Sequence, residues 1–231
     1  MFYKDWETIY KKISEDLIFS IEQDKKAADI FNKLLQNRKL FSINELKNLI
    51  SGKEVFVFGA GPSLETSIIL NKKKFCNHLK IASDGATSAL MENNILPDLI
   101  VTDLDGKVSD QKKANSKGCI TIIHAHGDNI ENIKKYVPKF KGKILGTTQT
   151  DPKPYSNLQN FGGFTDGDRA IFLSRHFKAK KIFLIGFDFN KGIGKYSFPK
   201  KKNKNLKLKK LRWCKYLIEL LKKEKQNIQE L

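Results

Sequence analysis

Short, continuously apolar segments that end in glycine or polar residues constrain the fold of this chain more than any other feature. Five such segments lie at residues 54–58, 79–83, 119–123, 143–146 and 181–186. A sixth opens the acidic stretch 97–106. Most of them are separated by helical patterns. Strands that are apolar on both faces are typical of a parallel sheet covered by helices on both sides. We therefore predict an α/β fold with a mainly parallel sheet.

Helical patterns precede the first of these segments. Apolar residues recur every three or four positions over residues 3–21, and a second such pattern covers residues 27–35. Ser42 and Glu45 then form a capping-box pattern in front of a third helix. We expect these helices to form an N-terminal cap that spans residues 1–52.

The rest of the chain divides into a core and a tail. Residues 53–198 hold all the apolar segments and form the expected α/β catalytic core. Residues 199–231 carry 12 Lys or Arg against 3 Asp or Glu. The net positive charge of this segment is half of the formal charge of +18. We expect this basic tail to form a helix whose apolar stripe packs on the body. This helix is either simply solvated, or its positive charge helps to attract a polyanion such as ATP.

The composition also limits the cellular location and the partners that we expect. No run is long enough to span a bilayer, and the N-terminus lacks the clean apolar segment of a signal peptide, so we expect a cytoplasmic protein. Its three cysteines have no CxxC spacing and predict neither disulfides nor a zinc site. Basic and aromatic residues are not interleaved in the body, so nucleic acid is not an expected partner. The oligomeric state is left open, with a homodimer as one alternative.

The stretch 97–106 carries the strongest chemical signal. An apolar strand leads into Asp103 and Asp105, which would point to one side if the strand continued, with Leu104 opposite. In a parallel sheet both acids would lie at the carboxyl edge, where such sheets bind ligands. Two close carboxylates favour a Mg²⁺ site. The alternative is a solvated acid followed by an Asp-Gly turn.

A glycine-rich turn follows the first apolar segment. Gly59 and Gly61 would let the backbone approach a ligand, and the helix after Ser63 would offer free N–H groups to an anion. The pattern lacks the Lys-Ser/Thr of a P-loop and the third glycine of the dinucleotide fingerprint. It therefore indicates a phosphate or nucleotide site, with a tight strand-to-helix turn as the alternative.

Two further motifs follow later segments. His124, His126 and Asp128 have a spacing that could bind a metal, but no fourth ligand is evident, so we favour contacts to substrate or phosphate, with a structural role as the alternative. Thr165 and Asp166 open a helix, where either of them could simply be the N-cap.

Taken together, these motifs resemble the archaeal 6-hydroxymethyl-7,8-dihydropterin pyrophosphokinases, whose core is similar to that of thiamine pyrophosphokinase. The resemblance extends over roughly residues 54–188. It is carried in order by residues 59–64, 84–86, 97–106, 124–128 and 164–170.

The resemblance implies a role for each motif. The metal ligands and catalytic residues would be Asp103, Asp105 and Asp166, and Asp166 would either complete the Mg²⁺ site or accept the hydroxyl proton. The residues that bind ATP would be Gly59, Gly61, Pro62, Ser63, Asp84, Gly85 and Thr165. The pterin ring needs a carboxylate and an aromatic face, for which Asp128 or Asp188 and Phe161 or Phe164 are candidates, and His126 would add a polar contact.

The chain departs from the thiamine pyrophosphokinase motifs at three positions. Ala86 replaces a glycine, and Thr102 and Gly106 replace the glycine and serine around the paired acids. No room remains for the β-rich second domain that helps to bind thiamine in that family, which makes thiamine the less favoured acceptor. The resemblance therefore implies Mg²⁺-dependent transfer of diphosphate from ATP to 6-hydroxymethyl-7,8-dihydropterin, with release of AMP.

Two other functions compete with this one. A strand followed by Gly-x-Gly-Pro-Ser-Leu also opens certain sialyltransferases and motility accessory proteins, so a nucleotide-sugar glycosyltransferase ranks second. A basic module that binds nucleic acid ranks third, since half of the charge excess lies in the tail.

Overall fold

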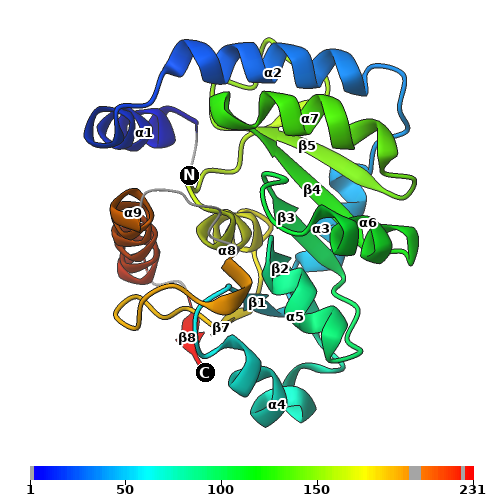
Figure 1. The fold of residues 1–231 in the computed structure, drawn as a ribbon, viewed down its shortest axis with the longest axis vertical. Helices are drawn as coiled ribbons and strands as arrows, with labels where there is room; N and C mark the ends of the chain where they lie inside the picture. Colours follow the sequence, from blue (N-terminus) through cyan, green and yellow to red (C-terminus); the bar gives the residue numbers. More distant parts are fainter. Residues whose placement is uncertain (1–2, 198–203, 225–226) are drawn as a thin grey trace.

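A single sheet organises the protein. The computed structural model describes residues 3–197, 204–224 and 227–231. Within these residues, eight strands form one sheet in the order β6-β5-β4-β3-β2-β1-β7-β8, and every neighbouring pair is parallel (Figure 1). The predicted parallel α/β fold is confirmed.

Six of the strands correspond to the predicted apolar segments, and β6 and β8 were not predicted. Both are short and lie at the two edges of the sheet. The strands are β1 (Glu54–Phe58), β2 (Leu79–Ser83), β3 (Leu99–Thr102), β4 (Ile120–Ala125), β5 (Ile144–Thr148), β6 (Leu158–Gln159), β7 (Lys181–Ile185) and β8 (Ile228–Glu230).

Helices fill most of the connections. They are α1 (Tyr3–Leu17), α2 (Ile21–Leu35), α3 (Ile43–Ile50), α4 (Leu64–Phe75), α5 (Ala86–Glu92), α6 (Val108–Ser116), α7 (Ile130–Tyr136), α8 (Asp166–His176) and α9 (Lys204–Lys223). Short 3₁₀ turns lie at η1 (Gly127–Asn129), η2 (Val137–Lys139) and η3 (Lys195–Ser197). The segment 199–203 of the predicted tail lies outside the described residues.

The boundary between the first two helices lies earlier in the sequence than predicted. The pattern over residues 3–21 breaks after Leu17, because Ile18 has a φ of +56° that no helix accommodates. Ser20 then caps α2 by accepting a hydrogen bond from the backbone N–H of Gln23 (3.3 Å). The predicted capping box of Ser42 and Glu45 is present at α3.

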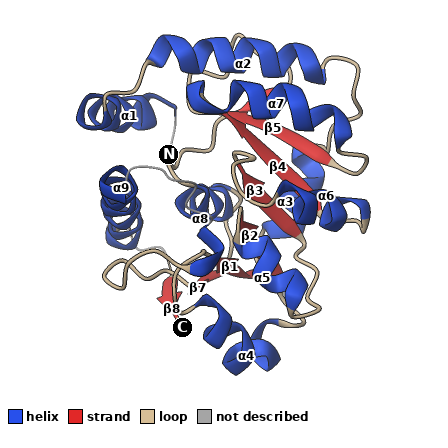
Figure 2. Cartoon of the chain, in the orientation of Figure 1, coloured by secondary structure: helices blue, strands red, loops and turns tan. Residues whose placement is uncertain are grey.

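Helices cover both faces of the sheet (Figure 2). Alternate residues of β1 show why: Val55 and Val57 pack with α1, α3, α8 and α9, whereas Phe56 and Phe58 pack on the opposite face with α4 and α5. Farther along that second face, α2 and α7 cover β4 and β5. The N-terminal helices thus share their cores with the sheet.

The terminal helix α9 packs on the body, as its apolar stripe predicted. Its residues Cys214, Leu217, Ile218 and Leu221 are buried in the same core as α1 and α8. None of the described helices combines the length and the apolar character that crossing a bilayer requires.

The packing of α2 predicts a large stability cost for Phe31→Ala. Phe31 is fully buried between α2 and the sheet, so we expect the free energy of unfolding to fall by about 3–5 kcal/mol in urea denaturation. Ile69→Ala on α4 is the control, because Ile69 is 65% exposed and should cost no more than about 0.5 kcal/mol. Equal effects of the two variants would contradict the assignment of α2 to the core.

Candidate active site

A cavity of about 780 Å³ opens at the carboxyl edge of the sheet. It lies between the loops that follow the central strands, the start of α8, and the inner side of α9. Ligands of open parallel sheets bind at this edge. Twelve of the predicted site residues line it: Gly59, Gly61, Asp84, Gly85, Asp103, Asp105, His126, Asp128, Phe164, Thr165, Asp166 and Asp188.

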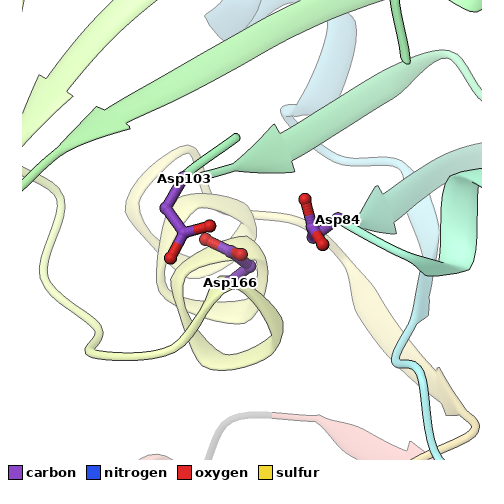
Figure 3. A group of neighbouring side chains, drawn as sticks. All are labelled: Asp84, Asp103 and Asp166. Atoms are coloured by element: carbon purple, nitrogen blue, oxygen red, sulfur yellow. The ribbon is translucent and has the colours of Figure 1, made fainter. Parts of the chain in front are cut away.

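Three carboxylates converge at this cavity (Figure 3). Asp84 follows β2, Asp103 follows β3, and Asp166 is the first residue of α8. One oxygen from each lies within 4.8 Å of the others. The metal site was predicted from Asp103, Asp105 and Asp166, but the geometric cluster contains Asp84, which was expected to bind ATP, in place of Asp105.

The backbone between the paired acids does not continue the strand as predicted. β3 ends at Thr102, and Leu104 adopts a φ of +65°. The backbone N–H of Asp105 donates to Oδ1 of Asp103 (3.1 Å), which closes a turn. Leu104 is buried under α2 and α7, so both acids face the cavity because of this turn and not because of strand alternation.

Asp84 is held from two sides. Its Oδ1 accepts hydrogen bonds from Oγ1 of Thr102 (2.7 Å) and from Nε2 of Gln111 (2.6 Å). A Cβ on Gly106 would lie 2.9 Å from Cγ of Asp84, closer than such contacts allow. Two departures from the thiamine pyrophosphokinase motif, Thr102 and Gly106, therefore both support the placement of Asp84.

Asp103 is paired with a histidine. Nε2 of His126 lies 3.1 Å from Oδ2 of Asp103, and Nδ1 of His126 accepts from the backbone N–H of Asp128 (3.3 Å). With Nδ1 accepting, Nε2 carries the proton and donates to Asp103. Nδ2 of Asn129 donates to the backbone carbonyl of Asp103 (2.8 Å), which fixes the loop beneath it.

Asp166 heads a chain of hydrogen bonds that reaches α2. Its Oδ1 pairs with Nη1 of Arg169 (3.0 Å), and Nη2 of Arg169 donates to Oε1 of Gln149 (3.2 Å). Nε2 of Gln149 donates to Oδ2 of Asp24 (2.8 Å), which also bonds Tyr10. Oδ1 of Asp24 accepts from the backbone N–H of Gly127 (2.6 Å), beside His126.

Sequence reasoning missed Asp24, Gln149 and Arg169 as site residues. Arg169 was part of a quoted motif without a role, and Gln149 follows a predicted strand. Asp24 had one usable signal, since it shares the inner stripe of α2 with Ala27 and Phe31. An acid on such a stripe must find partners inside the fold.

The three acids titrate very differently. Burial, followed by the charges of Asp105 and Asp103, raises the pKa of Asp84 to about 7. Burial and the charge of Asp103 also raise the pKa of Asp166 well above its usual range. Burial alone would raise the pKa of Asp103, but the hydrogen bond from His126 and its other partners outweigh it and lower that pKa. A bound cation would relieve this repulsion.

The glycine-rich turn binds protein groups where phosphate was expected. The backbone N–H groups of Gly59 and Gly61 donate to the carbonyls of Ile185 (2.8 Å) and Gly186 (2.9 Å). The N–H and Oγ of Ser63 both donate to Oδ2 of Asp188, at 2.8 and 2.6 Å. The Asp188 carboxylate thus occupies the start of α4.

These contacts give the glycines of this turn a structural role. A Cβ on Gly61 would lie 2.5 Å from the carbonyl oxygen of Gly186, so the glycine is needed for close approach to β7. Pro62 and Ser63 do not line the cavity, whereas Gly59 and Gly61 do. The N–H groups of Gly59, Gly61 and Ser63 thus have protein partners, and binding of ATP by this turn stays a prediction.

Two other candidates lie away from the cavity. His124 is buried, with Nδ1 3.0 Å from Oγ1 of Thr147, so it does not join His126 and Asp128 in a metal site. Phe161 packs against His176 and Phe177 at the C-terminal end of α8.

Four aromatic side chains, Phe19, Phe164, Phe187 and Phe189, form an aromatic wall in the same cavity. Phe164 lies against Phe19, with ring centroids 5.9 Å apart, and Phe187 and Phe189 complete the wall. Thr165 caps α8, and its N–H and Oγ1 donate to Asp168. The alternative reading of Thr165 as an N-cap is therefore correct, and the residue also lines the cavity.

Comparison with known proteins identifies full-length relatives. The chain matches the family model described as "6-hydroxymethylpterin diphosphokinase MptE-like" over residues 11–193. Proteins named 6-hydroxymethyl-7,8-dihydropterin pyrophosphokinase are 47% identical in Methanocaldococcus jannaschii, with 95% of each chain covered, and 43% identical in Pyrococcus furiosus, with 96% of this chain and 95% of the relative covered. A third, from Methanothermobacter thermautotrophicus, is 39% identical over 84% of this chain and 82% of its own.

A solved structure shares the fold. The MAf glycosyltransferase from Magnetospirillum magneticum AMB-1 superposes with a TM-score of 0.51 at 15% identity, over 72% of this chain and 27% of that chain. At this identity the likeness concerns the fold alone, so the glycosyltransferase alternative is not favoured over the family of the sequence relatives. The chain belongs to the MptE-like family of 6-hydroxymethylpterin diphosphokinases.

Proposed function

We propose that this protein transfers diphosphate from ATP to 6-hydroxymethyl-7,8-dihydropterin. The hydroxymethyl oxygen forms a bond to the β-phosphorus, and the bond from that phosphorus to the α,β-bridging oxygen breaks. AMP leaves with the bridging oxygen, and the hydroxyl proton is released. The observation that carries the proposal is the convergence of Asp84, Asp103 and Asp166 beside a cavity of ligand size, in a chain of this family.

The three acids fit Mg²⁺. Carboxylate oxygens are its preferred protein ligands, and one oxygen from each acid can reach a common point. Mg²⁺ held there would offset the negative charge that develops during phosphoryl transfer. We assign Asp84, Asp103 and Asp166 to the metal. Asp105 lines the same cavity and stays a candidate for a contact through water.

The partners of the acids set their geometry before any ligand arrives. Arg169 holds one oxygen of Asp166, which favours the role of metal ligand over that of proton acceptor. Thr102 and Gln111 hold Asp84, and His126 holds Asp103. Reactions of this kind depend mainly on such positioning and on charge neutralisation.

The flat pterin and adenine rings fit the aromatic wall. Phe164 and Phe19 offer ring surface inside the cavity. Since the Asp188 carboxylate is bound to Ser63, we favour Asp128, at the exposed rim, for the guanidine-like edge of the pterin. We keep the cytoplasm, which supplies ATP, as the expected location.

The first test is AMP release. With ATP and Mg²⁺, we expect AMP to form only when 6-hydroxymethyl-7,8-dihydropterin is present, in step with a diphosphorylated pterin, because the hydroxymethyl oxygen is the attacking group. Thiamine is the control acceptor and should give no AMP. Folded protein that releases no AMP with either acceptor would refute the proposal.

The second test separates the metal ligands from their neighbours. We expect Asp84→Asn, Asp103→Asn and Asp166→Asn each to lower turnover by at least about 100-fold, because removing even a ligand's supporting partner costs up to that much. Glu131→Gln is the control, since the side chain of Glu131 is 85% exposed on α7, and should leave turnover unchanged. Full activity of any of the three Asn variants would remove that residue from the metal site.

Mg²⁺ affinity should also depend on pH. Because the pKa of Asp84 is raised to about 7, a proton competes with the metal below that pH and leaves as the pH rises. We therefore expect Mg²⁺ binding, followed by calorimetry, to tighten between about pH 6 and 8. The Asp84→Asn variant should bind Mg²⁺ weakly and lose the part of this dependence that Asp84 contributes, whereas Asp166, whose pKa is also raised, keeps its own part. A pH-independent affinity in the wild-type protein would contradict the role of Asp84.

A further inference from the structure

The basic terminal helix is part of the cavity wall. Five residues of α9 line the cavity on the side of the aromatic wall: Leu206, Lys207, Lys210, Leu211 and Cys214. The helix lies beside α8, whose first residue is Asp166 (Figure 1). The lysine-rich segment is therefore placed to act on whatever occupies the cavity.

Lys210 has an unusual position on this helix. It precedes Cys214 by one turn and shares the inward stripe that continues through Leu217 and Leu221, all three of which are buried. Neighbouring Lys209 and Lys215 lie on the exposed face. Lys210 is half-buried on this stripe, so its charge lies against the protein at the edge of the cavity.

The ammonium of Lys210 rests on two aromatic rings of the cavity. Its Nζ lies 5.2 Å from the ring centroid of Phe19 and 5.9 Å from that of Phe164. Phe164 is two residues before Asp166, and Lys210 and the three acids line the same cavity. The four-carbon stem of lysine is flexible, and its ammonium can turn toward a phosphate near the start of α8.

Charge in the cavity requires a cation of this kind. Seven aspartates line it: Asp24, Asp84, Asp103, Asp105, Asp128, Asp166 and Asp188. Among the basic side chains in the lining besides Lys210, Arg169 is paired with Asp166, His126 donates to Asp103, and Lys207 donates to the backbone carbonyl of Ser197 (2.8 Å). ATP carries about four negative charges and one Mg²⁺ offsets about two of them. A nucleotide entering this acidic cavity therefore needs further positive charge from the protein.

We propose that Lys210 binds the β- and γ-phosphates of ATP in this cavity. The inference deepens the proposed function by assigning its nucleotide-binding side to α9. An ammonium bonds more strongly to phosphate than to an aromatic face. Lys210 thus leaves the rings when the triphosphate binds, and the ring faces of Phe19 and Phe164 become available to a flat ligand.

Calorimetric titration of the full-length protein with Mg·ATP and with AMP tests this. Lys210→Met keeps the stem and removes the charge, and we expect it to weaken Mg·ATP binding about ten-fold or more, with AMP binding changed less than about two-fold because AMP lacks the two phosphates. Lys210→Arg should retain most of the affinity. Lys215→Met is the matched control, since it removes one charge from the exposed face of the same helix, and should have almost no effect.

The outcomes separate this inference from the proposed function. Equal Mg·ATP affinities of Lys210→Met and Lys215→Met would overturn the inference, and so would equal losses for Mg·ATP and AMP. Wild-type protein that releases no AMP with the pterin, but whose Mg·ATP binding depends on Lys210, would refute the reaction and leave the inference standing. Thermal unfolding checks that each variant is folded, and Lys210→Gln replaces Lys210→Met if the latter is not. No Mg·ATP binding by the wild-type protein would overturn both.

Discussion

Repulsion among three half-buried carboxylates is the constraint on which the rest of the site depends. Asp84, Asp103 and Asp166 offer oxygens within 4.8 Å of one another, at an energetic cost that only partners or a cation can offset. Each acid has its own support from a different part of the fold. Thr102 and Gln111 hold Asp84, His126 holds Asp103, and Arg169 holds Asp166. Because each acid has different partners, the three acids differ in pKa and each carboxylate is held in one orientation.

The same constraint explains why the N-terminal helices share the core of the sheet. Arg169 is held by Gln149, and Gln149 is held by Asp24 on α2. Asp24 also accepts the N–H of Gly127, next to the histidine that supports Asp103. Hydrogen bonds therefore run from one acid of the cluster through α2 to the loop of another. Loosening α2 would disturb both supports at once, which ties the stability of this helix to the geometry of the cluster.

The sheet could be predicted because its strands are apolar on both faces and end in polar residues, as parallel strands buried between helices must. The same logic placed Asp84 and Asp103 at one edge, whereas Asp166 was assigned to the site through the family resemblance. It failed where the backbone leaves regular structure: the positive φ of Leu104 has no sequence signal, and it decides how Asp103 and Asp105 are presented. It failed also for contacts between distant segments, such as Asp188 at the start of α4.

Thr102 and Gly106 show how local departures from a related motif can act together. Thr102 donates to Asp84 from the end of β3, whereas Gly106 leaves space for the same carboxylate from the loop that follows. A side chain at position 106 would displace Asp84 from the hydrogen bonds that Thr102 and Gln111 provide, and a residue without a hydroxyl at position 102 would leave Asp84 less restrained. The two residues therefore act on the same carboxylate, one by a hydrogen bond and the other by leaving space, and together they present Asp84 to the cluster.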